Sequence, residues 1–395
     1  MILVLLEYLK GLGLHVPAVF EYVSARMMCA AITSLLISIF WGPRFIKKLY
    51  EWKIGQPIRT EDCPLLGKLH EKKKDTPTMG GALIIFAIVA SMILWMDWNQ
   101  IFTWLLLVTA LVLAFLGGYD DYLKLRYKNN DGLYGRKKLL IQFLLSGAVA
   151  AYLTVPAVSE FVQVYTGIPI PFAKDAEGSY PVWEYSQKLY FPFFKEPLNW
   201  FVGSALFFVV PFFMMFVITG SSNSVNLTDG LDGLAAGAVV LVASTLAVVA
   251  FVSNNFYISN FLNILYIEGS GEIAVFLCAL AGASLGFLWY NCYPAQVFMG
   301  DTGSLSLGGL IGVSAVLLKR EFLLAIVGGL FVAEALSVIL QVVSYRYRNK
   351  KRIFLCAPLH HHFEYKGWPE SKVVIRFWIV GLILAIIGIA SLKFQ

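Results

Sequence analysis

The chain has 395 residues, of which 58% are hydrophobic and only 14% charged, and its net charge is +6. A soluble domain carries roughly 25% charged residues, so this chain lacks the polar surface of a water-soluble protein, and we expect no nucleic-acid partner. The five cysteines form no CxxC pair, which argues against a zinc site and against a disulfide framework.

Apolar runs long enough to cross a bilayer recur along the whole chain. A spanning helix needs about 20 mostly apolar residues. Residues 1–20 are interrupted by Glu7 and Lys10 and lack a signal-peptide pattern, so we expect a short interfacial helix there. We predict an all-α membrane protein with a single domain over residues 1–395, a bundle of about ten transmembrane helices at 22–42, 79–97, 101–119, 138–155, 201–218, 233–252, 273–289, 304–318, 322–344 and 374–392.

Lys and Arg residues divide unevenly between the two alternating sets of loops. The loops at 43–78, 119–138 and 345–373 hold 9, 6 and 7 of them, whereas the loops of the opposite set hold 5 in total. Because basic loops stay in the cytoplasm, the first set is predicted to be cytoplasmic and both termini to face out. The segment 156–200, rich in Pro and aromatic residues, is predicted to be an outer loop or hairpin at the membrane surface.

The third predicted span ends in the acidic motif GGYDDYLK (117–124). Charges at that depth must be paired or used, and helical spacing places Lys124 one turn from Asp120. Magnesium takes one or two carboxylates and fills its other positions with water and phosphate oxygens, so Asp120 and Asp121 are candidate site residues. The alternative is a salt bridge that only ends the helix.

A second polar motif, GSSNSVNLTDGLDGLAAG (220–237), lies between the fifth and sixth predicted spans. Its Asn and Asp residues recur every third position, which aligns them along one side of a short helical turn, and its glycines allow close backbone approach to a ligand. The chain has no GxxxxGK[ST] phosphate loop. An ordinary turn between helices is the alternative. The four aligned side chains are Asn223, Asn226, Asp229 and Asp232.

Two further motifs carry polar residues on the same side of the membrane. In NCYPAQVFMGDTGS (291–304), Asp301 stands between two glycines at a helix start, where free N–H groups favour phosphate, although it could simply cap that helix. PLHHHFE (358–364) holds three of the five histidines. With no HExxH or cysteine pair nearby, we favour phosphate or substrate contact over zinc, and a general base remains open.

Two basic stretches, EKKKDTPTMGG (71–81) and GRKK (135–138), lead into the second and fourth predicted spans. Anchoring to the cytoplasmic membrane surface accounts for most such charges, but an anionic substrate also needs cations beside it. The four polar motifs described before these stretches all fall on the side with the basic loops, a fact that was not used to assign that side. The sequence therefore predicts one shared site for magnesium-dependent phosphoryl transfer at one face of a membrane.

The motifs KKDTPTMGG (73–81), GGYDDYLK, NSVNLTDGLDGLA (223–235), FMGDTGSL (298–305) and PLHHHFE appear together and in this order. On them the sequence resembles the polyprenyl-phosphate N-acetylhexosamine-1-phosphate transferases, and most closely the branch that acts on UDP-MurNAc-pentapeptide. The resemblance implies a ten-helix enzyme, often a homodimer, in the bacterial inner membrane, with periplasmic termini and a cytoplasmic site. It implies Mg²⁺ as cofactor, and transfer of phospho-MurNAc-pentapeptide to undecaprenyl phosphate with release of UMP.

The same resemblance assigns roles to single residues. Asp75 stands where the family usually has Gly and adds a charge beside Lys73. A sister transferase that uses UDP-GlcNAc and, in another class, a secondary transporter are the rival interpretations. The implied catalytic residues are Asp120, Asp121, Asp301, Lys73, Lys124, Lys138, His360, His361 and His362, the implied magnesium ligands are Asp301 with Asp121 or Asp229, and the implied substrate-binding residues are Asn223, Asn226, Asp229, Asp232, Asn291, Phe298 and Gln341.

Overall fold

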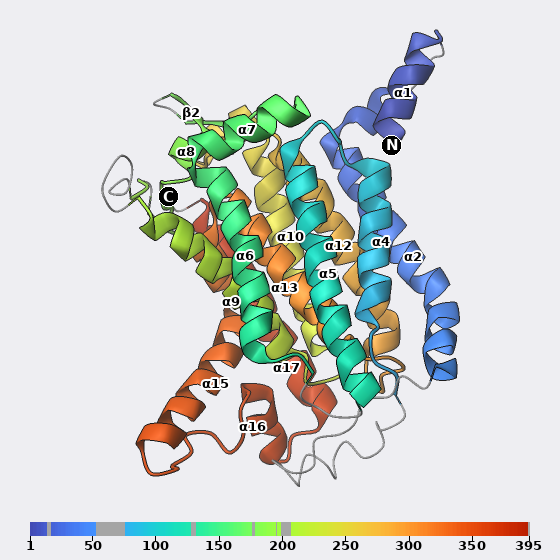
Figure 1. The fold of residues 1–395 in the computed structure, drawn as a ribbon, viewed down its shortest axis with the longest axis vertical. Coiled ribbons are helices and arrows are strands. Elements are labelled where there is room, and N and C mark those ends of the chain that lie inside the picture. Colours follow the sequence, from blue (N-terminus) through green and yellow to red (C-terminus); the bar gives the residue numbers. More distant parts are fainter. Residues whose placement is uncertain are drawn as a thin grey trace.

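The computed structural model describes residues 1–13, 17–52, 76–127, 132–175, 178–194, 196–198 and 207–393, and it is mostly helical (Figure 1). The elements before the second half of the chain are α1 (Ile2–Gly11), η1 (Ala18–Glu21), α2 (Val23–Glu51), α4 (Gly81–Trp95), α5 (Ile101–Tyr127), α6 (Gly135–Thr154), α7 (Pro156–Thr166), β1 (Phe172–Lys174), β2 (Ser179–Pro181) and α8 (Val182–Tyr185). They are followed by α9 (Val209–Thr228), α10 (Leu234–Ser253), α11 (Phe256–Phe261), β3 (Tyr266–Ile267), α12 (Ser270–Asn291), α13 (Gly300–Leu317), α14 (Glu321–Val327), α15 (Gly329–Tyr347), α16 (Leu359–Tyr365) and α17 (Glu370–Ser391).

The bundle is built around α12 and α13. α12 packs along α2 and α10, and α13 packs along α5 and α9. Glycines let the backbones approach: a Cβ at Gly282 would overlap the Ala31 carbonyl of α2, and one at Gly286 would lie 2.7 Å from the Leu35 carbonyl oxygen. Small residues at helix interfaces are how membrane helices gain packing energy where lipid is as apolar as the side chains.

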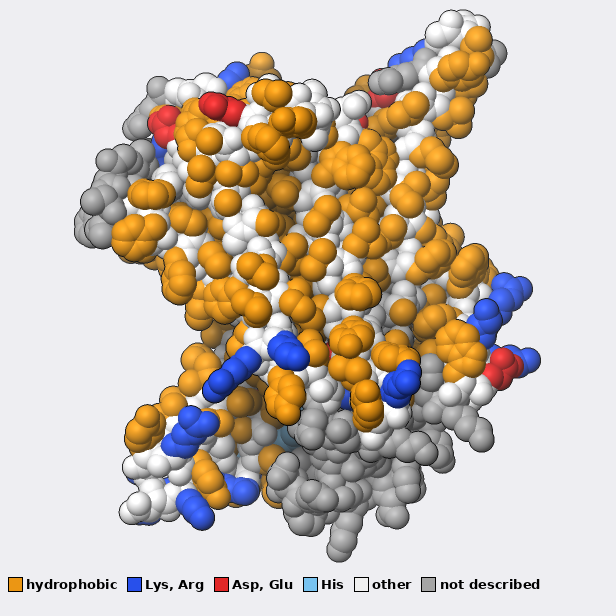
Figure 2. Space-filling view, in the orientation of Figure 1, with side chains coloured by type: hydrophobic (Ala, Val, Ile, Leu, Met, Phe, Trp, Pro, Cys, Tyr) orange, Lys and Arg blue, Asp and Glu red, His pale blue; other side chains and the backbone are white. Residues whose placement is uncertain are grey.

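All ten predicted spans contain helix in the described residues, with 322–344 divided into α14 and α15. By length and hydropathy, six helices of the described part qualify as membrane spans, or seven if α6 and α7, bent by 91° at one break, count as one span. Figure 2 shows a broad belt of hydrophobic side chains, with Lys and Arg gathered beyond one edge of it. The protein is thus a helical, multi-span membrane protein. The short helix expected at the start of the chain is present as α1.

The segment 156–200 contains the hairpin expected there. β1 pairs antiparallel with β2, and β3, much later in the chain, pairs with the other edge of β1, so that Ala173 lies opposite Ile267. α7, α8 and this small sheet lie at the end of the bundle where both termini are found (Figure 1). The acidic motifs lie at the opposite end.

Candidate active site

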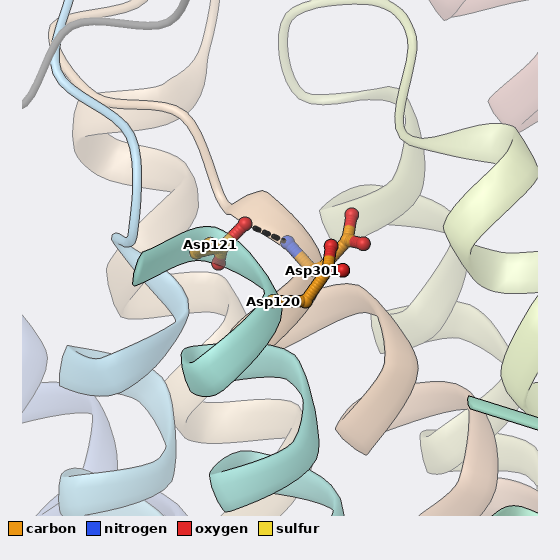
Figure 3. A group of neighbouring side chains, drawn as sticks. All are labelled: Asp120, Asp121 and Asp301. Carbon is orange, nitrogen blue, oxygen red and sulfur yellow. Dashed lines mark hydrogen bonds between the residues drawn. The ribbon is translucent and has the colours of Figure 1, made fainter. Parts of the chain in front are cut away.

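Three carboxylates meet where α5 ends and α13 begins. Asp120 and Asp121 lie on α5 and Asp301 in the first turn of α13, and one ligand oxygen from each lies within 4.8 Å of the others (Figure 3). Asp120 is fully buried and Asp121 is 2% exposed. Acidic side chains are almost never buried unless they are paired, so their partners decide what this cluster does.

Two glycines allow the helices to come this close. A Cβ at Gly117 would overlap the Asp301 carbonyl, and a Cβ at Gly81, at the start of α4, would overlap the backbone of Gly303. The Gly-Gly pairs in the motifs at 73–81 and 117–124 are therefore explained by packing. They allow α4 and α5 to lie directly against the first turn of α13.

Asp121 binds the first turn of α13 through both of its oxygens. The backbone N–H of Asp301 donates to Oδ1 at 3.1 Å (dashed line in Figure 3), and the backbone N–H and hydroxyl of Thr302 donate to Oδ2 at 2.9 and 2.7 Å. A carboxylate at a helix N-terminus satisfies free N–H groups and interacts favourably with the helix dipole. The sequence allowed such a cap for Asp301, but the structure places Asp121 in that position.

Two lysines join Asp120 to Asp301. Lys124 Nζ lies 2.7 Å from Asp120 Oδ2 and 3.0 Å from Asp301 Oδ2. Lys138 Nζ, from the first turn of α6, lies 2.8 Å from each of the same two oxygens. The backbone N–H of Leu133 donates to Asp120 Oδ1 at 2.6 Å. The predicted pairing of Lys124 with Asp120 is present, and it belongs to a four-residue ion cluster rather than to a simple helix end.

The two asparagines of the second motif lie on the last turns of α9, and one of them, Asn226, contacts the carboxylate cluster. Asn226 Nδ2 donates to Asp301 Oδ1 at 2.9 Å and to Ser304 Oγ at 2.8 Å. Asn223 Nδ2 donates to Oε1 of Gln142 at 2.8 Å. Gln142 is buried on α6 and was missed by the sequence analysis, although a single amide inside an apolar run is itself a signal of an intramembrane partner.

The two aspartates of the second motif lie in the turn that follows α9. Asp229 is half-buried, and loss of water around its carboxylate raises its pKa to about 8, with the negative charges of Asp301 and Asp121 adding to the shift. Asp232 accepts the backbone N–H of Ala295 at 3.0 Å, while Asn291 accepts the Gly233 N–H at 3.1 Å. The expected single row of four side chains is therefore divided. Asn226 contacts Asp301, Asp229 lies close enough to feel the charges of Asp301 and Asp121, Asn223 bonds to Gln142, and Asp232 joins two loops.

The three histidines of α16 have three different partners. His360 is fully buried beside Glu334 of α15, with 3.2 Å between Nδ1 and Oε2. His361 Nδ1 lies 2.6 Å from Glu364 Oε2. His362 Nδ1 accepts the Leu355 N–H at 3.1 Å, and burial, helped by Lys366, lowers its pKa, which favours the neutral ring. The three side chains therefore do not present one uniform surface to a phosphate.

Two further predicted residues lie on different segments, Phe298 just before α13 and Gln341 on α15. The Phe298 backbone pairs with the segment before α4, with Phe298 N–H donating to Pro77 at 2.8 Å. Gln341 accepts the N–H groups of Ile353 and Phe354 at 3.0 Å each, and so shapes the loop that follows α15. Lys73 lies outside the described residues.

The carboxylate cluster has the donor chemistry of a magnesium site. Its ligands are all oxygens, and magnesium prefers one or two carboxylates with the remaining positions left to water and phosphate. In the described part of the chain, the metal-compatible group contains Asp120, Asp121 and Asp301, and Asp229 adds charge from outside it.

Comparison with known proteins assigns this arrangement to a family. The model of glycosyl transferase family 4 matches residues 103–319, and a phospho-N-acetylmuramoyl-pentapeptide-transferase signature matches residues 73–85. The chain is 63% identical to the phospho-N-acetylmuramoyl-pentapeptide-transferase of Protochlamydia amoebophila over the full length of both chains. The chain belongs to the phospho-N-acetylmuramoyl-pentapeptide-transferase family.

More distant members of the family cover nearly the whole chain as well. Those of Desulfotalea psychrophila and Thermodesulfovibrio yellowstonii are 45% and 44% identical, over 95% and 98% of this chain and 95% and 97% of their own lengths. The family model spans all three carboxylates, Lys124, Lys138 and Asn226, and the signature spans Lys73 and Gly81. The resemblance seen in the sequence motifs is thereby confirmed.

Proposed function

We propose that the chain transfers phospho-MurNAc-pentapeptide from UDP-MurNAc-pentapeptide to undecaprenyl phosphate in peptidoglycan synthesis. A lipid-phosphate oxygen forms a bond to the β-phosphorus, the bond from that phosphorus to the bridging oxygen breaks, and UMP leaves with that oxygen. Full-length identity of 63% to a transferase of this name supports the assignment. The observation that carries it is the oxygen-only carboxylate cluster, joined to two lysines, at one end of an apolar bundle.

We propose a one-step, in-line reaction in which positioning and charge stabilisation do most of the work. When bound, magnesium would offset the charge of the diphosphate, held by Asp301 together with Asp229 or Asp121. Lys124 and Lys138 would stabilise the phosphate oxygens that carry charge in the transition state. Asp121 belongs to the metal-compatible group but already accepts three hydrogen bonds, whereas Asp229 lies outside that group.

Asp120 would position the lipid phosphate and the two lysines. As a nucleophile in a two-step route it would have to give up partners on both oxygens, since Leu133 occupies one and the lysines the other. Trapping of radiolabelled phospho-sugar on the protein without the lipid acceptor would contradict the one-step route. Lys73, His361 and His362 remain predicted catalytic residues, and Asn291, Phe298 and Gln341 remain predicted substrate-binding residues.

We further propose ten spans in a bacterial inner membrane, with both termini in the periplasm and the site facing the cytoplasm. Two observations support this orientation. Both termini lie at the end of the bundle opposite the carboxylates (Figure 1), and Lys and Arg side chains gather beyond one edge of the apolar belt (Figure 2). A homodimer is proposed from family resemblance alone, and light scattering of the purified protein in detergent tests it.

Donor selectivity tests the proposed function against its rivals. Purified protein should release UMP from UDP-MurNAc-pentapeptide, and release from UDP-GlcNAc should be at background. Faster release from UDP-GlcNAc would make the chain a sister transferase. Movement of substrate across liposomes without any UMP formed would instead indicate a transporter.

A further inference from the structure

Glu334 is a fully buried acid on α15, outside the carboxylate cluster and outside every motif of the sequence analysis. A carboxylate among apolar helices is costly unless its oxygens are satisfied. Here both oxygens accept backbone N–H groups from the first turn of α16, from Leu359 at 2.7 Å and from His360 at 3.2 Å. Glu334 therefore fixes where α16 begins.

The same carboxylate holds the ring of His360. Oε2 of Glu334 lies 3.2 Å from Nδ1 of the imidazole, and both side chains are almost fully buried. The opposite edge of the ring lies against Gly230, where a Cβ would overlap Nε2 and would lie 2.9 Å from Cε1. His360 thus fills the space that the missing side chain of Gly230 leaves.

Gly230 belongs to the turn 229–233, which carries Asp229 and links α9 to α10. Other partners hold the far part of this turn: Glu370 accepts the Asp232 N–H at 2.8 Å, and Asn291 accepts the Gly233 N–H at 3.1 Å. The near part, next to Asp229, is where His360 packs. Displacement of His360 would free that part of the turn while leaving the far part attached.

We propose that Glu334 is a positioning residue, which seats His360 against Gly230 and so fixes Asp229 relative to the carboxylate cluster. The expected effect of Glu334 on the rate of UMP release rests on the proposed function. Its expected effect on the position of the 229–233 turn does not. Residues that support a metal ligand from behind typically change affinity or activity about 10- to 100-fold when mutated.

The first test compares Glu334→Gln with Ser337→Ala. The amide keeps the size of the carboxylate but offers one acceptor oxygen to the two backbone N–H groups of Leu359 and His360. Ser337 is a buried neighbour on the same helix whose hydroxyl donates to a backbone carbonyl. Hydrogen exchange should quicken in Glu334→Gln at both 357–366 and 226–236, and UMP release should fall about 10- to 100-fold with a higher KM for magnesium. Ser337→Ala should match wild type within about twofold.

The second test uses shape. Gly230→Ala should impair turnover as Glu334→Gln does, because the new methyl group would overlap the His360 ring and displace it. Unchanged exchange at 226–236 in Glu334→Gln, or wild-type turnover in Gly230→Ala, would overturn the proposal. If wild type released no UMP but the exchange pattern held, the proposed function would fail and the positioning role would stand.

Discussion

Thr302 donates both its hydroxyl and its backbone N–H to the same oxygen of Asp121, at 2.7 and 2.9 Å. This double contact crosses from α13 to α5 and determines where the next residue back, Asp301, presents its carboxylate. The geometry of the cluster therefore depends on a threonine whose side chain belongs to no ion pair.

Thr302→Val should test that dependence, because valine keeps the shape and removes only the hydroxyl. A hydrogen bond to a charged group contributes about 1.5–3 kcal/mol, so we expect UMP release to fall about tenfold and the melting temperature to drop by a few degrees. Thr302→Ser keeps the donor and should stay near wild type. A serine variant as slow as the valine variant would show that the methyl group, and not the hydrogen bond, matters.

Lys138→Gln should separate metal binding from turnover. Lys138 places positive charge 2.8 Å from oxygens of both Asp120 and Asp301. Its removal makes the pocket more negative, so magnesium should bind more tightly, while the phosphate oxygens lose a stabilising cation and UMP release should fall by about 10²-fold or more. The adjacent, exposed Lys137 provides the control, and Lys137→Gln should change neither quantity. Weaker magnesium binding in Lys138→Gln would contradict this sign.

Asp301→Asn should lose magnesium binding, measured by calorimetry in detergent, together with magnesium-dependent UMP release. Asp301 is the carboxylate that contacts both lysines and Asn226, so an amide there removes the charge around which the others are arranged. Glu160→Gln, on the exposed face of α7 at the other end of the bundle, should leave both unchanged. Full magnesium-dependent turnover by Asp301→Asn would disprove the metal assignment.

The proposed topology can be tested by thiol labelling. Cys292 is exposed in the loop before α13, and Ser179 is exposed on β2 at the opposite end. A membrane-impermeant maleimide applied to intact spheroplasts should label a Ser179→Cys variant and leave Cys292 unmodified until the membrane is opened. Labelling of Cys292 in sealed spheroplasts would reverse the orientation.

Much of the fold could be predicted from the sequence because hydropathy alone places apolar runs in helices. The carboxylate cluster was also predictable, since adjacent acids at the end of a span need a use. The roles within it were not. Asp120 and Asp121 are neighbours in sequence, yet Asp121 binds the start of α13 and Asp120 pairs with two lysines. Each role depends on which residues lie opposite the side chain in the neighbouring helices, and the sequence does not show this.

The histidine motif illustrates the same limit. Three consecutive histidines in the sequence suggest three side chains with the same surroundings. In a helix, however, successive side chains point in directions about 100° apart. His360 therefore faces the buried Glu334, while His361 and His362 face Glu364 and the Leu355 backbone. In the sequence, Glu334 and Gln142 are only single polar residues within apolar runs. Their partners come from other helices, so the surrounding sequence does not reveal them.

The most direct test of the proposed transfer is UMP release by the purified protein from UDP-MurNAc-pentapeptide with undecaprenyl phosphate, in magnesium or in EDTA. We expect stoichiometric UMP and lipid-linked phospho-MurNAc-pentapeptide in magnesium, background release in EDTA, and recovery when magnesium is restored. UMP release that needs no lipid acceptor, or that proceeds unchanged in EDTA, would contradict the proposed function.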